Sequence, residues 1–142
     1  MRYDEVREML LRQWKYTGGP NEAIASAIYH DDAVLEFPQS GERFRGKANI
    51  QGWRERYPAR LEFEPREIRG AGDLWVAEAR IRYDDGDPIH FVKIVEFRGE
   101  LVRRETIYFA DPFSAPDWRK PWADDRPVEA GGDLPALVHG GS

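Results

Sequence analysis

The 142-residue sequence contains no cysteine. This absence excludes disulfides, thiol nucleophiles and zinc sites built on thiolates. It also suits a reducing compartment, and the charged start MRYDEVREML lacks the apolar segment of a secretory signal, so we expect a cytoplasmic protein. No apolar run approaches the roughly 18 residues that a membrane span requires, so no membrane partner is expected.

An excess of basic charge is also absent. The net charge is −5, and lysine and arginine are interleaved with acidic residues along the chain. We therefore expect no nucleic-acid partner, because such partners require a continuous basic surface. The run His30-Asp31-Asp32 carries metal-binding side chains, but three consecutive residues cannot converge on one ion without further ligands. We interpret it as the loop that ends a helix, and we expect no metal and no cofactor.

Aromatic residues, by contrast, are abundant, with five tryptophans, six tyrosines and seven phenylalanines. Aromatic side chains fill cores, and they also line pockets for apolar ligands. The length suits one domain that can bury a core without disulfides or structural metals.

The spacing of apolar residues predicts an α+β fold. A four-residue apolar period predicts helices over 4–16, 21–30 and 47–57, and a short strand over 33–38 precedes the third helix. From Leu61 onward the period becomes two, which predicts strands over 61–69, 74–83, 89–97 and 101–109. The strand at 89–97 is apolar on both faces, so we expect it to be central and covered on both sides. Helices followed by an antiparallel meander are typical of the α+β class.

Two segments carry a family resemblance. IYHDDAVLEFPQSGERFRGKANIQGW resembles the signature of SnoaL-like proteins, with an acidic pair, a short strand ending in proline, a glycine turn and a helix. RGELVRRETIYFADPF resembles their last hairpin and strand. The resemblance covers roughly residues 4–113 and implies a nuclear transport factor 2-like (NTF2-like) cone, in which a curved antiparallel sheet wraps around three N-terminal helices and encloses a pocket. It also implies a homodimer formed through the outer sheet face.

The resemblance also sets the expected division of the chain. Residues 1–113 are expected to form the SnoaL-like domain. Residues 114–142 are expected to form an extended, proline-rich tail. We expect Phe113 and Trp118 to pack back on the cone or on a partner subunit.

The family's known chemistries can be compared with this sequence position by position. Steroid-isomerase relatives carry a proton-abstracting Asp where this chain has Phe37, and a carboxylic acid on the penultimate strand where it has Val95. Epoxide hydrolase relatives use an Arg-x-Asp pair, and here the matching positions are Arg80-Ile81-Arg82. Glu105 can stand for their second acid, and Asp32 is a candidate for the missing one.

SnoaL-type cyclases require less, namely one general base beside an acidic C–H and donors for the developing enolate. The resemblance places their acid on the last strand, where Glu105 or Thr106 is the nearest match. We predict Glu105 as the base, with a pKa raised by an apolar lining, and His90 or Tyr108 as the donor. The alternative is that Glu105 forms a charge pair with Arg103, Arg80 or Arg82 across the sheet.

A set of mostly aromatic residues is predicted to bind the ligand, although any one of them could equally be plain core. The set comprises Trp14, Phe37, Trp53, Tyr57, Trp75, Tyr83, Phe91 and Thr106. The expected ligand is a small, largely apolar or polyketide-like molecule. Three functions remain open at this point: a SnoaL-like cyclase or isomerase, a non-catalytic binding domain, and a limonene-type epoxide hydrolase with rearranged acids.

Overall fold

The computed structural model describes residues 1–128 and 137–138. Its helices are α1 (Tyr3–Tyr16), α2 (Glu22–Ala25) and α3 (Lys47–Glu55), with 3-10 turns η1 (Ser26–Ile28) and η2 (Asp117–Trp122). Its strands are β1 (Tyr29–Phe37), β2 (Glu42–Arg45), β3 (Leu61–Ala71), β4 (Leu74–Tyr83), β5 (Ile89–Arg98), β6 (Leu101–Ala110) and β7 (Leu137–Val138). No helix of this described part is long and apolar enough to cross a membrane.

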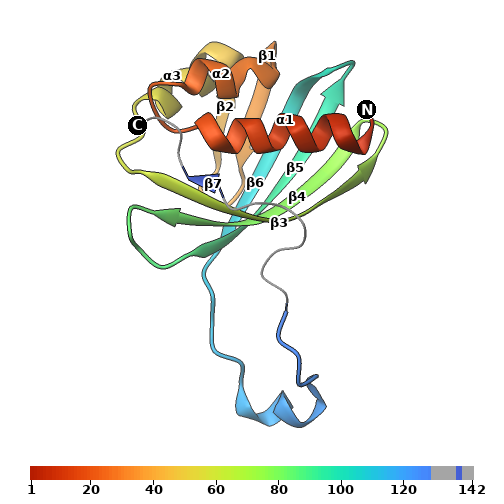
Figure 1. The fold of residues 1–142 in the computed structure, drawn as a ribbon. Helices are drawn as coiled ribbons and strands as arrows, with labels where there is room; N and C mark the ends of the chain where they lie inside the picture. The colour runs from red at the N-terminus through yellow and green to blue at the C-terminus, as the bar shows by residue number, and fades with distance from the viewer. Residues whose placement is uncertain (129–136, 139–142) are drawn as a thin grey trace.

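The strands form one curved sheet, with the helices gathered on one face of it (Figure 1). The strand order is β2-β1-β6-β5-β4-β3-β7. The predicted α+β class and the order of helices before a long meander are confirmed. The sheet is mixed rather than wholly antiparallel, because β1 runs parallel to β6.

Helix α1 closes the concave side of the sheet. Its residues Val6, Leu10 and Trp14 repeat every four positions, and all three are fully buried against the sheet. The chain then turns at Gly18, which has a φ of +83°. A Cβ at this position would lie 2.5 Å from Leu61 Cδ1, so glycine serves both the turn and the close approach to β3.

The second helix is shorter than predicted. It ends at Ala25, the 3-10 turn η1 follows, and β1 begins at Tyr29, so His30-Asp31-Asp32 lies in a strand and not in a loop that ends a helix. The reason is long-range pairing, because Tyr29 aligns with Val102 of β6. Asp32 is exposed and forms an ion pair with Arg98 at 2.7 Å.

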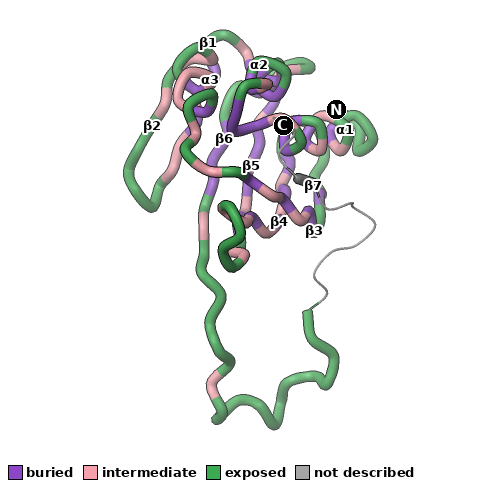
Figure 2. The backbone as a smooth tube through the Cα atoms, turned by 60° about the vertical axis from the view of Figure 1, so that its left-hand side comes forward, coloured by how far each residue is buried: buried purple, intermediate pink, exposed green. Residues whose placement is uncertain are grey.

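Burial is concentrated between the helices and the concave sheet face (Figure 2). Alternation along β4 and β5 turns Trp75, Ala77, Phe91 and Val95 inward, and all four are buried. Strand β5 is central, as predicted. Its outer face is only half buried, since no helix among the described residues covers that side.

The chain leaves the sheet after β6. Residues 111–128, here called the arm, extend away from the cone with η2 at the tip, and the chain returns as β7 beside β3 (Figure 1). Phe113 is 82% exposed and Trp118 is 75% exposed. The expectation that these residues pack back on their own cone is therefore wrong. Residues 129–136 and 139–142 of the predicted tail lie outside the described residues.

Candidate functional site

A cavity of about 310 Å³ lies between the helices and the concave sheet face. Six of the residues predicted to bind a ligand line it, namely Trp14, Phe37, Trp53, Tyr57, Tyr83 and Phe91. Its polar lining includes Gln13, Arg54 and Lys93, which are buried, and Glu42, which is exposed.

The aromatic walls hold one another in place. Trp14 stacks on Phe63 with ring centroids 5.9 Å apart, and Tyr57 stacks on Tyr83 at 6.0 Å. Phe37 meets Trp53 edge-on at 6.0 Å. Such contacts restrict rotation of the rings, so the cavity presents flat apolar surfaces that are formed before any ligand arrives.

Two predicted binding residues do not line the cavity. Trp75 lies near the β3–β4 turn, where its indole N–H donates to the Gly72 carbonyl and its ring packs on Tyr3. Thr106 alternates with Glu105 and Ile107 along β6 and so faces the opposite side of the sheet. Both predictions are corrected, because strand alternation and position along the sheet place these side chains elsewhere.

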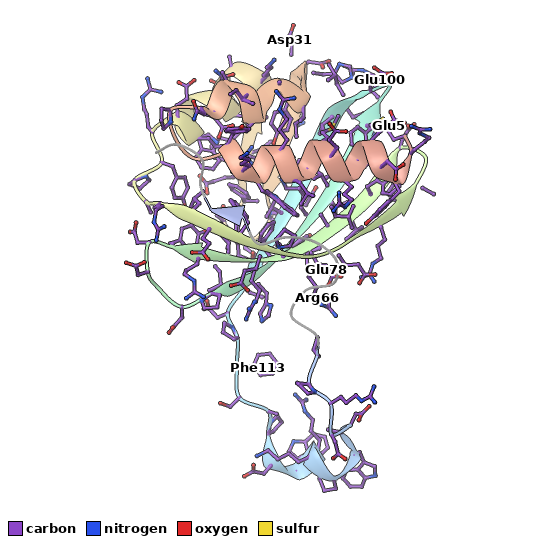
Figure 3. All side chains as sticks on the ribbon, in the orientation of Figure 1. Glu5, Asp31, Arg66, Glu78, Glu100 and Phe113 are labelled. Atoms are coloured by element: carbon purple, nitrogen blue, oxygen red, sulfur yellow. The ribbon has the colours of Figure 1, made fainter. Side chains whose placement is uncertain are left out.

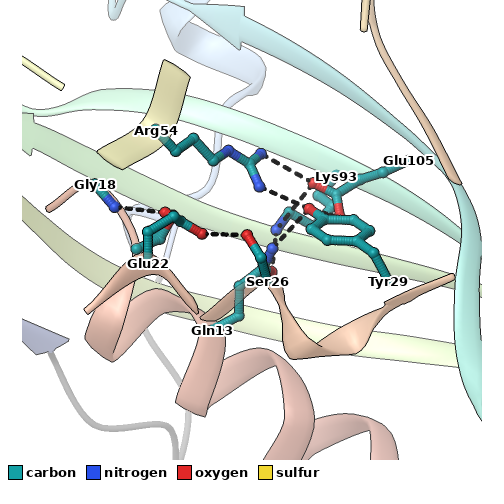
Figure 4. A network of polar contacts seen from close by, with 9 residues as sticks. Gln13, Gly18, Glu22, Ser26, Tyr29, Arg54, Lys93 and Glu105 are labelled. Carbon is teal, nitrogen blue, oxygen red and sulfur yellow. Dashed lines mark hydrogen bonds and ion pairs between the residues drawn. The ribbon is translucent and has the colours of Figure 1, made fainter. Parts of the chain in front are cut away.

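Beside the cavity lies a buried polar group, here called the Glu105 cluster: Gln13, Tyr29, Arg54, Lys93 and Glu105 (Figure 4). Glu105 is fully buried and accepts a hydrogen bond from the Tyr29 hydroxyl at 2.9 Å. One of its oxygens lies 3.4 Å from Arg54 Nη2 and 3.4 Å from Lys93 Nζ. The uncertain strand register is thus resolved, with Glu105 inward and Thr106 outward.

The remaining members close the network. Arg54 Nη1 donates to the Tyr29 hydroxyl oxygen at 2.7 Å, and Gln13 Nε2 donates to the same oxygen at 2.9 Å. Lys93 Nζ donates to Gln13 Oε1 at 2.5 Å. The cluster holds two basic groups and one carboxylate, so it carries net positive charge when Lys93 is protonated.

The surroundings shift the pKa of every titratable group in this cluster, and the shifts of Glu105 and Lys93 bear on its chemistry. Burial alone would raise the pKa of Glu105, but Lys93 and Arg54 outweigh it and hold that pKa below its ordinary value. Burial lowers the pKa of Lys93 to about 8, with Arg54 acting in the same sense and Glu105 opposing it. The prediction of a raised Glu105 pKa is therefore wrong, since two cations lie where an apolar lining was expected.

The sequence pattern contained a signal for this cluster. Lys93 occupies an inward position of β5 between Phe91 and Val95, where an apolar residue is the rule. Arg54 follows Ile50 by four residues on α3 and so shares its buried face. Sequence reasoning missed both cations, together with Tyr29 and Gln13.

His90 and Tyr108 lie on the wrong side of the sheet for the predicted chemistry. His90 alternates with the inward Phe91 and is exposed, and Tyr108 is 43% exposed. Each therefore faces away from the interior that holds Glu105. Neither can act as a donor in the cavity of this chain.

The arginines predicted to pair with Glu105 also lie elsewhere. Arg80 and Arg82 both pair with Glu64, and Arg103 pairs with Glu96. Arg80 and Arg82 point outward, while Ile81 between them lines the cavity. The charge-pair alternative is thus corrected in its partners, which are Arg54 and Lys93.

A second acid for epoxide chemistry is not brought to Glu105. Asp32 is exposed and paired with Arg98. The buried Glu22 accepts hydrogen bonds from the Thr17 hydroxyl at 2.6 Å, the Gly18 amide at 2.8 Å and the Ser26 hydroxyl at 2.6 Å. These bonds tie the end of α1 to α2 and occupy the Glu22 carboxylate.

Comparisons with known proteins agree with this architecture. The family model of the SnoaL-like domain matches residues 16–105. An NTF2-like protein of unknown function from Burkholderia xenovorans is 41% identical, with a TM-score of 0.80 over 89% of this chain and 99% of its own. The NTF2-like cone expected from the sequence is thus confirmed. No curated protein sequence matches this chain at the significance required of a relative.

More distant structures share the fold alone. A Kribbella flavida protein assigned provisionally as a ketosteroid isomerase is 19% identical, with a TM-score of 0.76 over 91% of this chain and 95% of its own. A Sinorhizobium meliloti protein assigned provisionally as a polyketide cyclase is 21% identical, with a TM-score of 0.60 over 75% and 95%. At such identities the activity must be argued from the site.

Proposed function

Because the chain belongs to the SnoaL-like domain family, we propose that its cavity binds a small, flat, largely apolar molecule bearing one anionic or carbonyl oxygen. The aromatic walls supply the apolar contacts. The oxygen lies at Lys93 and Arg54, the two cations of the cavity lining.

The charge balance of the Glu105 cluster carries this proposal. Glu105 does not itself line the cavity, and it is the carboxylate that contacts both Lys93 and Arg54. The buried Glu22 also attracts both cations, but without direct contact, because its oxygens accept from Thr17, Gly18 and Ser26. Two buried cations thus share one contacting carboxylate, and incompletely compensated buried charge is costly. A ligand carboxylate or enolate would add a second close negative partner, and a charge-assisted hydrogen bond of this kind contributes about 1.5–3 kcal/mol.

Two probes with the same ring system test the proposal. 2-Naphthoate and 2-naphthamide differ in charge but share the flat apolar body, and calorimetry gives both dissociation constants. We expect naphthoate to bind roughly tenfold to a hundredfold more tightly, from the same hydrogen-bond energy. Lys93→Met should remove most of this preference, and it leaves Arg54 and Glu105 as a balanced pair. The exposed Lys15→Met is the matched control, and equal affinity of the wild type for both probes would refute the proposal.

A second candidate is proton-transfer chemistry of the cyclase or isomerase kind, and the pKa of Lys93 favours it. With a pKa of about 8, Lys93 can release its proton near neutrality and act as a general base. Lys93 Nζ would take a proton from a C–H beside the ligand carbonyl, the electron pair would move to the carbonyl oxygen, and Arg54 would hold the resulting enolate. Return of the proton to another carbon completes an isomerisation. Glu105 then positions Lys93 rather than reacting itself.

Deuterium exchange separates this candidate from plain binding. The acidic C–H groups of 2-tetralone exchange in D₂O, and proton NMR follows the loss of their signals. A general base contributes roughly 10²- to 10⁴-fold, so we expect the protein-catalysed exchange to disappear in Lys93→Met and persist in Lys15→Met. Exchange by the wild type at the rate of buffer alone would leave the non-catalytic binding domain as the function.

We also propose that two copies of the chain pair through the outer sheet face. The supporting observation is an apolar group, here called the outer stripe, made of Val76, Val92, Ile94 and Tyr108. Val76 lies opposite Ile94, and Val92 lies opposite Tyr108, so the stripe crosses three neighbouring strands. Its residues are half buried or exposed in the single chain.

A further inference from the structure

The arm (residues 111–128) exposes large apolar side chains and buries none of them. Phe113 and Trp122 are each 82% exposed, Trp118 is 75% exposed and Val128 is 79% exposed. Tryptophan and phenylalanine rarely remain in water in such density, and an exposed apolar patch of this kind marks an interaction site. These side chains therefore require a surface to pack on, and the described residues of the single chain do not provide one.

The arm lies on the outer side of the sheet. In Figure 3, Phe113 projects on the same side as Glu78 and Arg66, which belong to the outer faces of β4 and β3. The arm begins directly after β6, and the chain pairs with β3 again at β7. A molecule that docked on the outer face would lie alongside the arm.

We propose that the arm of each chain packs across the outer stripe of a second copy, which returns the same contact. The surfaces match in chemistry, since both are apolar centres surrounded by charges of both signs. Asp117, Arg119 and Lys120 belong to the arm, and Glu78 and Arg80 border the stripe. Two identical faces of mixed charge can meet without net repulsion, as a two-fold interface requires.

The apolar area favours a second copy over a short peptide. Each buried aromatic side chain removes roughly 150–250 Å² from water, so the aromatics of two arms together remove on the order of 1,000 Å². A stable interface buries about 1,200–2,000 Å² in total, and the covered stripes add to the contribution of the arms. The area buried by a reciprocal arm exchange thus reaches that of a stable dimer interface, whereas one arm on the surface of another protein would bury about half of that area.

This inference extends the proposed pairing through the outer face and is independent of ligand binding. Sedimentation velocity gives the dimer dissociation constant of the full chain and of two variants. The arm variant is Phe113→Ser/Trp118→Ser/Trp122→Ser, and the stripe variant is Val92→Glu. We expect the wild type to be a dimer and each variant to dissociate at least a hundredfold more readily. Ile24→Ser, at an exposed apolar residue of α2, should leave the dissociation constant unchanged.

Mixing the two variants provides a sharper test. Neither variant alone retains an arm–stripe contact, but a mixed dimer retains one, because the intact arm of the stripe variant meets the intact stripe of the arm variant. We therefore expect the mixture to associate at least tenfold more tightly than either variant alone. Far-UV circular dichroism at about 25 °C should show the wild-type secondary structure in the arm variant, since its substitutions lie on side chains that are exposed in the single chain.

The outcomes separate the two proposals. A dimer that the stripe variant breaks and the arm variant leaves intact would overturn the arm exchange while preserving pairing through the outer face. A wild type that remains monomeric at high micromolar concentration would overturn both, and would leave the arm for a different partner. Ligand binding in the cavity can persist in either case.

Discussion

Replacement of Glu105 by glutamine tests the Glu105 cluster directly. The substitution keeps the size of the side chain and an oxygen that can accept from Tyr29, but it removes the charge that faces Arg54 and Lys93. Breaking a buried ion pair from one side costs about 3–5 kcal/mol, because the partner charge remains without compensation. We therefore expect Glu105→Gln to lose about 3–5 kcal/mol of unfolding free energy at pH 7.

The two cations contribute differently to this loss. Lys93 has a pKa of about 8, so at pH 7 it can shed its proton at a cost of about 1.4 kcal/mol, which limits its share. Arg54 has a raised pKa and keeps its charge. At pH 9 Lys93 is already largely neutral, so the deficit of the variant should shrink by about 1 kcal/mol between pH 7 and pH 9.

Urea denaturation followed by tryptophan fluorescence measures both effects. Asp32→Asn is the control, because Asp32 also pairs with an arginine, Arg98 at 2.7 Å, but both side chains are exposed. Exposed pairs contribute about 0–1 kcal/mol, so this control should change little. A Glu105→Gln variant within about 1 kcal/mol of the wild type would refute the reasoning that Glu105 compensates buried charge.

Two other perturbations follow from the same structure. The folded pKa of Lys93, about 8, lies below its ordinary value of 10.5, so between these values the unfolded chain holds a proton that the folded chain has released. The unfolding free energy of the wild type should therefore rise with pH relative to that of Lys93→Met, by up to about 1.4 kcal/mol per pH unit. Urea denaturation of both proteins at pH 7.5 and 9.5 measures this difference in unfolding free energy, and the same difference at both pH values would contradict the prediction. Gly70→Ala would place a Cβ 2.3 Å from the Leu74 carbonyl oxygen and 2.7 Å from Trp75 Cα, so we expect overpacking to cost about 1–3 kcal/mol in addition to the backbone strain of a side chain at its φ of +157°. Gly72→Ala in the same hairpin meets no atom within 4 Å and should cost only about 1–2 kcal/mol for its left-handed backbone; equal melting temperatures of the two variants would contradict this comparison.

The fold could be predicted further than the site. Alternation along residues 74–83 was strong enough to give β4 its observed bounds, because each inward position is apolar. The start of β1 could not be predicted from local pattern, since Tyr29 becomes a strand residue only by pairing with β6. The two-residue strand β7 carries no period of its own and depends on β3 for its partner.

The aromatic walls of the site could be predicted from the sequence, whereas its buried polar cluster could not. Aromatic residues on inward positions lead directly to a lined cavity, as Trp14 and Phe91 illustrate. The polar contacts depend on how distant elements meet, and Arg54 reaches Glu105 because α3 packs on β1, which pairs with β6. The direction of the Glu105 pKa shift followed from those neighbours and not from burial, which is why sequence reasoning gave the wrong sign.

The Glu105 cluster also bears on how the protein folds and stays folded. Its five residues come from α1, β1, α3, β5 and β6, and two of its hydrogen bonds span 76 and 80 residues of sequence. Contacts of such long range pay the entropy of closing large loops, so they assemble late, after the hairpins of the meander have formed. Interactions absent from the transition state act mainly on the unfolding rate. We therefore expect the cluster to leave the folding rate largely unchanged and to slow the unfolding of the cone around its cavity.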